Sequence, residues 1–214
     1  MAAADPTLET ERALFAAGAT TVIGCDEVGR GALAGPVAVG VAVIDAGVPA
    51  IPSGLRDSKL LSEQRRQALE PLAKAWVLHS AVGLASAEEV DELGIVTCLG
   101  LAGKRALTAL HEAGVDITGS VVLLDGNDDW LNKALSTPLN VVTRIKADRD
   151  CGSVAAASVI AKVHRDRLMI EADERSPGYG WAGNKGYGSA AHLSAIAELG
   201  PHHLHRKSWL KFSA

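Results

Sequence analysis

The stretch TVIGCDEVGRGALAGPVAVGVAVI, residues 21–44, contains two strand-like runs joined by acidic and glycine-rich residues. The first run, 21–25, is apolar and ends at the adjacent carboxylates Asp26 and Glu27. The second run, 35–44, has valine at every other position, which is the pattern of a strand. Adjacent acids repel each other and glycines weaken strands, so this junction indicates a function as well as a fold.

Three further strands are predicted along the chain. A strand over 76–85 follows the first two through short connections, which suggests an antiparallel meander. The apolar run 120–125 ends in Asp125, and another strand is predicted over 139–145. The intervening link, 126–138, is just long enough for a crossover between parallel neighbours.

Helical patterns separate these strands. Together they predict an α/β fold around a mixed, mainly five-stranded sheet. One helix is expected to begin at Ser62, with Pro71 interrupting or ending it, and a second begins at Ser86, with Glu89 in a capping box, and runs towards Leu93. A longer helix follows to about Glu112, with Leu99, Ala102, Ala106 and Leu110 on one side. Two more are expected over 152–175, with Ser153 as the N-cap, and over 189–199, capped by Ser189.

Composition indicates one domain of a cytoplasmic protein. The 214 residues are 48% hydrophobic and 21% charged, with no apolar run of 18 residues and no secretory leader pattern. We therefore expect no membrane association, and nothing in the sequence demands a dimer, so we expect a monomer. The net charge of −4 does not exclude a polyanionic substrate, because the segment 202–211 is basic and contains no acid.

The three cysteines are too few for a disulfide framework. Cys25 and Cys151 both lie near acidic motifs, so a regulatory disulfide between them is one alternative. Burial as small apolar side chains is the other.

Acidic residues end three of the predicted strands. If the strands ending at Asp26 and Asp125 are parallel neighbours, the two carboxylates emerge side by side, because neighbouring strands lie about 4.8 Å apart. A third acidic cluster, with Asp148 and Asp150, follows the last strand. Clustered carboxylates must protonate, pair or bind cations, and Mg²⁺ and Mn²⁺ prefer oxygen ligands. The sequence therefore predicts a site for one or two such ions, although a single acid of this kind is usually a solvated surface group.

Seven blocks of the chain resemble the motifs of type 2 ribonuclease H, bacterial ribonuclease HII, and they occur in the family order. The resemblance covers about residues 21–209, and its first and fifth blocks are the most specific. The blocks are GCDEVGRGALAGPV from 24, DSKLLS from 57, LLDGN from 123, KAD from 146, SVAAASVIAKVHRD from 153, NKGYGS from 184 and HHLHRKSW from 202.

The resemblance implies a ribonuclease H-like fold and a two-metal endonuclease. The family acids match Asp26, Glu27, Asp125 and Asp148, and these would hold two Mn²⁺ or Mg²⁺ ions. The family usually has Lys-Gly-Asp where this chain has Lys-Ala-Asp, so Asp150 is a rival for the fourth acid. By this resemblance, 1–20 is an N-terminal extension or short helix, 21–175 the catalytic domain, and 176–214 a helical, basic C-terminal segment packed on the same domain.

The expected substrates are RNA–DNA hybrids and duplex DNA with embedded single ribonucleotides. Cleavage 5′ to the ribonucleotide would leave a 5′-phosphate and a 3′-hydroxyl, as ribonucleotide excision repair requires. The Gly29–Arg30–Gly31 step matches the family motif that senses the 2′-hydroxyl, and Tyr187 matches the tyrosine that packs on the next sugar. The remaining expected substrate contacts are Lys59, Asn127, Lys185, Ser189 and Arg206, with Arg144, Lys146, Lys162 and Lys207 as further candidates for phosphate.

Several of these residues have plainer readings. Lys162 could pair with Asp166 on one helix, and the small residues 155–158 suggest tight packing on the sheet. Two other functions remain open at this point: another divalent-metal phosphoryl hydrolase, and a non-catalytic module that binds hybrids. The first explains the acids but not the glycine step, and the second predicts that acids are missing.

Overall fold

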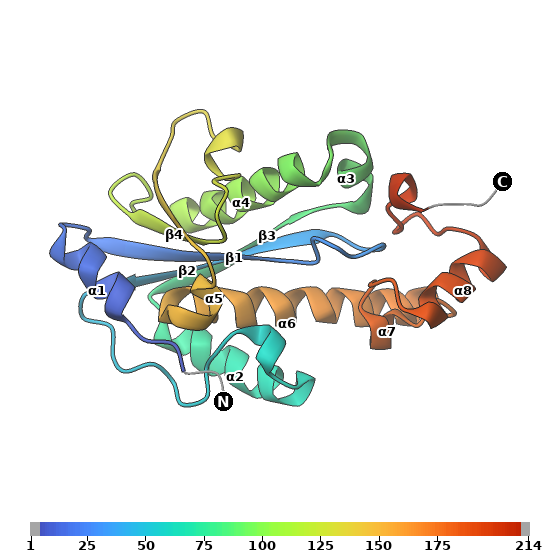
Figure 1. The fold of residues 1–214 in the computed structure, drawn as a ribbon, viewed down its shortest axis with the longest axis horizontal. Helices are drawn as coiled ribbons and strands as arrows, with labels where there is room; N and C mark the ends of the chain where they lie inside the picture. The colour runs from blue at the N-terminus through green and yellow to red at the C-terminus, as the bar shows by residue number, and fades with distance from the viewer. Residues whose placement is uncertain (1–4, 211–214) are drawn as a thin grey trace.

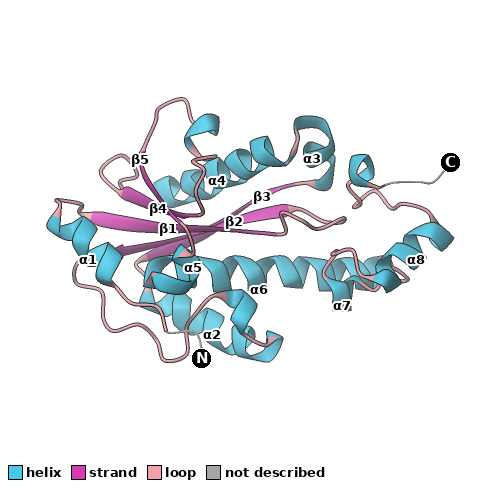
Figure 2. Ribbon diagram, viewed as in Figure 1, coloured by secondary structure: helices cyan, strands magenta, loops and turns pink. Residues whose placement is uncertain are grey.

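The computed structural model describes residues 5–210, which form a five-stranded sheet flanked by helices (Figures 1 and 2). The sheet order is β3-β2-β1-β4-β5. The β1–β2 and β2–β3 pairs are antiparallel, whereas β1–β4 and β4–β5 are parallel. The strands are β1 (Thr21–Val28), β2 (Val37–Asp45), β3 (His79–Ala85), β4 (Val121–Asp125) and β5 (Asn140–Arg144). This confirms the predicted mixed sheet, the antiparallel meander and the short parallel crossover.

Helices cover both faces of the sheet. In Figure 1, α3 and α4 lie above it, and α1, α2, α5 and α6 lie below it, with α7 and α8 beyond one end of the sheet. The helices are α1 (Glu9–Ala16), α2 (Glu63–Trp76), α3 (Ala87–Leu93), α4 (Ile95–Glu112), α5 (Ala147–Asp150), α6 (Gly152–Arg175), α7 (Trp181–Asn184) and α8 (Ala190–Leu199). Short 3₁₀ turns span Ser58–Leu60, Asn132–Ala134 and Lys207–Trp209.

Small residues let the backbone of α6 lie against the backbone of the sheet. A Cβ on Gly24 would come 2.3 Å from the carbonyl carbon of Ser153, and one on Gly40 would come 2.5 Å from the Ala157 carbonyl oxygen. Ala155, Ala156 and Ala157 are fully buried in the same layer. This confirms the tight packing expected of residues 155–158, and it places the start of α6 directly behind β1.

Several element boundaries differ from the prediction. The first strand does not end at residue 25 but continues through Asp26 and Glu27 to Val28. The second helix continues through Pro71 to Trp76, so the third strand begins at His79 rather than at 76. Pro71 faces solvent, where water can satisfy the carbonyl it leaves free, and the buried Leu69 and Trp76 hold the helix on the core. Tertiary packing therefore outweighs the local cost of proline.

The start of α6 also differs. Cys151 is its N-cap, and Ser153 lies inside the helix. The backbone N–H and the hydroxyl of Ser153 both donate to Glu11 Oε1, at 2.9 and 2.8 Å. The buried side chain of Glu11, from α1, thus takes the place of a local cap. An acidic group at this position is also stabilised by the positive N-terminal end of the helix dipole. The predicted capping box at Ser86 and the cap at Ser189 are both confirmed.

A regulatory disulfide between Cys25 and Cys151 does not fit this fold. Cys25 belongs to the apolar cluster on the α4 side of the sheet, and Cys151 belongs to the cluster on the α6 side. Both thiols are free and fully buried. The alternative reading, as small apolar side chains, is the one that the structure supports.

Within residues 5–210, no helix combines the length and the apolar character needed to cross a membrane.

Candidate active site

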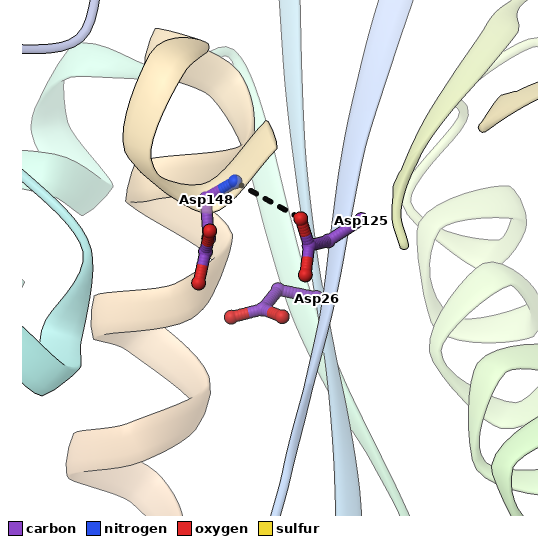
Figure 3. Close-up of side chains that lie close together, drawn as sticks. All are labelled: Asp26, Asp125 and Asp148. Carbon is purple, nitrogen blue, oxygen red and sulfur yellow. Dashed lines mark hydrogen bonds between the residues drawn. The ribbon is translucent and has the colours of Figure 1, made fainter. Parts of the chain in front are cut away.

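Three carboxylates converge at the end of the central parallel strands (Figure 3). Asp26 lies on β1, Asp125 is the last residue of β4, and Asp148 lies on α5, the short helix after β5. Cys25 pairs with Leu124 across the two strands, so the next residues of each strand are Asp26 and Asp125. One carboxylate oxygen from each of the three acids lies within 4.8 Å of the others. We call these residues the acidic triad.

The local backbone selects Asp148 over Asp150 for this position. Lys146 adopts the left-handed conformation, with φ 63°, and turns the chain from β5 into α5. The Asp148 backbone N–H then points at Asp125 Oδ1, 3.4 Å away. The carboxylate of Asp150 instead pairs with Arg144 at 3.2 Å. The geometry therefore brings Asp148 into the triad and leaves its rival on the surface.

The triad is a poor site for three free negative charges. Asp26 is 1% exposed, and within the described chain its Oδ2 has no hydrogen-bond partner. Burial, reinforced by Glu27, raises the pKa of Asp26 well above its usual value. Burial and the charge of Asp148 raise the pKa of Asp125. Oxygen donors that are crowded, buried and partly unpartnered fit a hard divalent cation.

Lys59 supplies positive charge beside the triad. Its Nζ lies 2.8 Å from Asp148 Oδ2 and 4.0 Å from Asp57 Oδ1, and its side chain is 65% exposed. Burial works to lower the pKa of Lys59, but the Asp148 hydrogen bond and the nearby acids outweigh it and raise the pKa above its usual value. Lys59 is therefore a charged side chain that can reach both the acids and solvent.

Glu27 lies next to the triad but outside it. Its backbone N–H donates to Asp26 Oδ1 at 2.9 Å, and its Oε1 lies 3.7 Å from Arg30 Nη1. Burial raises the pKa of Glu27, and the Arg30 charge opposes that shift. The fourth predicted acid is thus next to the triad in sequence but outside its cluster of oxygens, and in this structure it pairs with Arg30 of the glycine step.

Sequence reasoning overlooked two residues beside the site. Asp57 is 4% exposed and accepts a hydrogen bond from the Lys59 backbone N–H, which shapes the 3₁₀ turn that carries Lys59. Ser158, read only as a packing residue, is fully buried and donates to Ser58 Oγ at 2.9 Å. The block DSKLLS pointed to Asp57, whereas no local signal distinguished Ser158 from the alanines before it.

Two of the expected phosphate contacts are buried. Arg206 is 0% exposed, and its guanidinium donates to backbone carbonyls of the glycine step. Lys185 is 6% exposed, and its Nζ donates to Glu63 at 3.1 Å and to the Ala182 carbonyl. Neither side chain is free to meet a phosphate in this structure, because both carry internal hydrogen bonds instead.

The other expected substrate residues are on the surface, except Gly29, which is buried. Tyr187 is 37% exposed in the loop before α8, and its ring centroid lies 5.5 Å from the Arg165 guanidinium. Asn127 is exposed in the turn after β4, and the Ser189 hydroxyl caps α8. Gly29 has φ 82°, a conformation that favours glycine.

The remaining phosphate candidates divide into two groups. Lys162 pairs with Asp166 at 2.6 Å, as the alternative reading predicted, and Arg144 pairs with Asp150. Lys146 and Lys207 are exposed.

The family model for "Ribonuclease HII" matches residues 23–212 of the chain. Ribonuclease HII of Streptomyces griseus subsp. griseus is 47% identical over 213 residues, covering 98% of this chain and 86% of that protein. Ribonuclease HII of Thermus thermophilus is 45% identical over 186 residues, covering 87% of this chain and 84% of that protein.

A similar structure has been solved. The ribonuclease H2 of Pyrococcus horikoshii OT3 superposes with a TM-score of 0.70 at 27% identity, covering 88% of this chain and 93% of that one. The agreement covers most of both chains, so it supports the ribonuclease H-like fold that the sequence motifs implied.

Proposed function

This chain belongs to the ribonuclease HII family, and from that premise we propose that it cuts duplex DNA on the 5′ side of single embedded ribonucleotides. As a member of the family it is a ribonuclease H, a hydrolase that acts as an endonuclease on RNA–DNA hybrids. The family depends on divalent metal ions, and the acidic triad offers the oxygen ligands that such ions prefer. The convergence of the triad is the observation that carries the proposal.

The triad and Glu27 are the residues that would hold two Mg²⁺ or Mn²⁺ ions. The fit rests on the unpartnered Oδ2 of buried Asp26 and on carboxylate oxygens within 4.8 Å of one another. When bound, such ions would lower the pKa of the attacking water and neutralise negative charge on the phosphate and on the leaving 3′ oxygen. The acids themselves hold the ions and need not remove a proton.

The side chains around the triad would orient the phosphodiester. Lys59 is exposed enough to reach a phosphate while its Nζ stays close to Asp148. A cation at this position attracts the substrate backbone without reading its sequence. Hydrolysis in this geometry leaves a 5′-phosphate and a 3′-hydroxyl.

The glycine step would recognise the 2′-hydroxyl. Arg30 and Gly31 are exposed, and a Cβ built on Gly31 meets no atom within 4 Å. Backbone groups can approach a sugar closely where no side chain intervenes. The 2′-hydroxyl is the group that distinguishes RNA from DNA at one nucleotide. Tyr187, in the adjacent loop, would pack on the following sugar.

A substrate panel tests this proposal. One labelled duplex with a single ribonucleotide, an RNA–DNA hybrid, an all-deoxy duplex and a small phosphomonoester are each incubated with Mg²⁺, Mn²⁺ or EDTA. We expect cuts in the first two substrates only, no cutting in EDTA, and a cut 5′ to the ribonucleotide in the first. Hydrolysis of the phosphomonoester with the ribonucleotide left intact would favour a different phosphoryl hydrolase. Binding without cutting would favour a non-catalytic module.

Ribonucleotide removal from DNA is the role that this activity would serve. Action in the cytoplasm, and as a monomer, stays a prediction.

A further inference from the structure

Two buried arginines lie beneath the glycine step without an acidic partner. Arg165, on α6, and Arg206, in the C-terminal segment, are both 0% exposed. Among residues 5–210, neither guanidinium forms an ion pair with a carboxylate. Burial lowers the pKa of both, to about 10 for Arg206. Burying two unpaired cations is costly, so their hydrogen bonds must hold something specific in place.

The two guanidiniums donate six hydrogen bonds, and all go to backbone carbonyls. Arg206 donates to the carbonyls of Gly29, Arg30 and Gly35, at 2.7, 2.8 and 3.2 Å. Arg165 donates to those of Pro36, Ala34 and Lys185, at 2.8, 3.0 and 2.9 Å. Five of the six acceptors lie within residues 29–36, which we call the glycine loop.

The Arg206 contacts fix the direction of two peptide groups. In a planar trans peptide the C=O and the following N–H point in opposite directions. Because the carbonyls of Gly29 and Arg30 point at buried Arg206, the N–H groups of Arg30 and Gly31 point away from it. Neither N–H donates a hydrogen bond within the described chain. The glycine loop therefore presents two adjacent donors beside the open space over Gly31.

Arg165 connects the glycine loop to the loop that carries Tyr187. It holds the carbonyl of Lys185, and the N–H groups of Leu33 and Ala34 both donate to Gly186, at 2.8 and 3.1 Å. A Cβ on Gly29 would come 2.1 Å from Arg165 Nε, so the arginine fills the space beneath the loop. The two loops are thus one rigid unit.

We propose that Arg165 and Arg206 are positioning residues that set selectivity for the 2′-hydroxyl. They aim the Arg30 and Gly31 amides at that oxygen and fix the distance between the glycine loop and Tyr187. The inference rests on the proposed function, because it concerns recognition of a ribonucleotide. A lysine could not replace either arginine, since one ammonium cannot reproduce the fixed directions of three donors.

The test measures kcat and KM on two duplexes that differ in one 2′ substituent. One carries a single ribonucleotide, and the other carries its 2′-fluoro analogue, a poor hydrogen-bond acceptor. Arg206→Met, Arg206→Lys and Arg165→Lys are compared with Arg167→Met, a matched control on α6 whose side chain is 54% exposed and pairs with Glu70. Folding is checked by circular dichroism, and the triad by calorimetric titration with Mn²⁺.

For the Arg206 and Arg165 variants we expect the ratio of kcat/KM between the two duplexes to fall about tenfold, the value of one lost hydrogen bond. Mn²⁺ affinity should stay unchanged, and Arg167→Met should keep the wild-type ratio. If Arg206→Met does not fold, the two lysine variants, which keep the buried charge, carry the test.

An unchanged ratio in folded lysine variants, with both duplexes cut equally more slowly, would overturn the inference and leave the arginines a purely structural role. A wild-type protein that does not cut the ribonucleotide duplex would instead refute the proposed function itself.

Discussion

The ammonium of Lys59 lies 2.8 Å from Oδ2 of Asp148, so a side-chain cation faces the acidic triad. Lys59 lies on the 3₁₀ turn Ser58–Leu60, which is distant in sequence from all three acids of the triad. Its charge offsets part of the repulsion among carboxylates that lie within 4.8 Å of one another. The protein thus places a permanent positive charge where the metal ions of the proposed mechanism would bind.

Replacing Lys59 with methionine should tighten metal binding. At about 4 Å, two charges in water interact by about 1 kcal/mol, so removing the ammonium should improve Mn²⁺ affinity about fivefold. Titration calorimetry measures this directly, and KM for the nucleic acid should rise at the same time. Lys133→Met is the control, because Lys133 pairs with Asp128 on the exposed surface. Weaker Mn²⁺ binding to Lys59→Met would show that the lysine organises the triad rather than competing with metal.

Replacing Asp26 with asparagine should stabilise the metal-free protein while abolishing cleavage. The buried Asp26 carboxylate has an unpartnered Oδ2 and two neighbouring acids, so neutralising it removes an unfavourable charge. We expect the free energy of unfolding in urea, at neutral pH with EDTA, to rise by about 1 kcal/mol. Asp150→Asn, which removes a partly exposed ion pair, should change it little. If Asp26→Asn is instead less stable than the wild-type protein, the negative charge of Asp26 is already compensated in the metal-free protein.

Two glycine substitutions should separate stability from recognition. Gly31→Ala puts a methyl group into open space, so the free energy of unfolding should change by less than about 0.5 kcal/mol. Cleavage at a single ribonucleotide should nevertheless fall, because the methyl group would occupy the space proposed for the sugar. Gly24→Ala places its Cβ 2.3 Å from the Ser153 backbone. It should destabilise the fold by about 3 kcal/mol, measured by urea denaturation.

Full activity of Gly31→Ala on that duplex would place the 2′-hydroxyl elsewhere.

A chain of hydrogen bonds fixes the tautomers of two buried histidines behind Tyr187. The Trp181 indole N–H donates to His192 Nε2 at 3.0 Å, so His192 Nδ1–H donates to the Tyr187 carbonyl at 2.8 Å. The His202 backbone N–H donates to His205 Nδ1 at 2.8 Å, so the His205 proton lies on Nε2, which is 3.1 Å from His192 Nε2. The His205 ring is neutral in this arrangement, because its Nδ1 accepts a hydrogen bond.

This network predicts acid sensitivity. Burial lowers the pKa of His205 to about 4, below the usual 6.5. The stability that neutral His205 contributes is therefore complete above pH 6.5 and is lost as the pH falls towards 4, by up to about 1.4 kcal/mol per pH unit for one proton. His205→Gln keeps an N–H donor but cannot be protonated, so its unfolding free energy should depend less steeply on pH in this range. Parallel pH profiles for the two proteins would refute this assignment.

Periodicity and strand ends predicted most of the fold and the meeting of Asp26 with Asp125. Alternating valines located β2, and acids at the ends of two apolar runs predicted a shared sheet edge. The boundary errors at Pro71 and Ser153 have one cause: contacts from distant segments, α6 in one case and Glu11 in the other, override the local signal.

The roles of charged residues were harder to predict. A buried and an exposed arginine look alike in a sequence, so Arg206 was expected at the phosphate rather than beneath the glycine loop. The spacing of Asp148 and Asp150 also left two alternatives open. Only the left-handed turn at Lys146, which depends on how β5 enters α5, decided which carboxylate joins the triad.

The most direct test of the central claim compares Asp125→Asn with Asp150→Asn on a duplex that carries one ribonucleotide, in Mg²⁺ and in Mn²⁺. The account predicts that Asp125→Asn loses at least about a hundredfold in kcat, because the triad loses a charged ligand. Asp150→Asn should stay near the wild-type rate and cut at the same 5′ position. Wild-type cleavage by Asp125→Asn, or a comparable loss in Asp150→Asn, would contradict the assignment of the acidic triad as the metal-dependent cutting site.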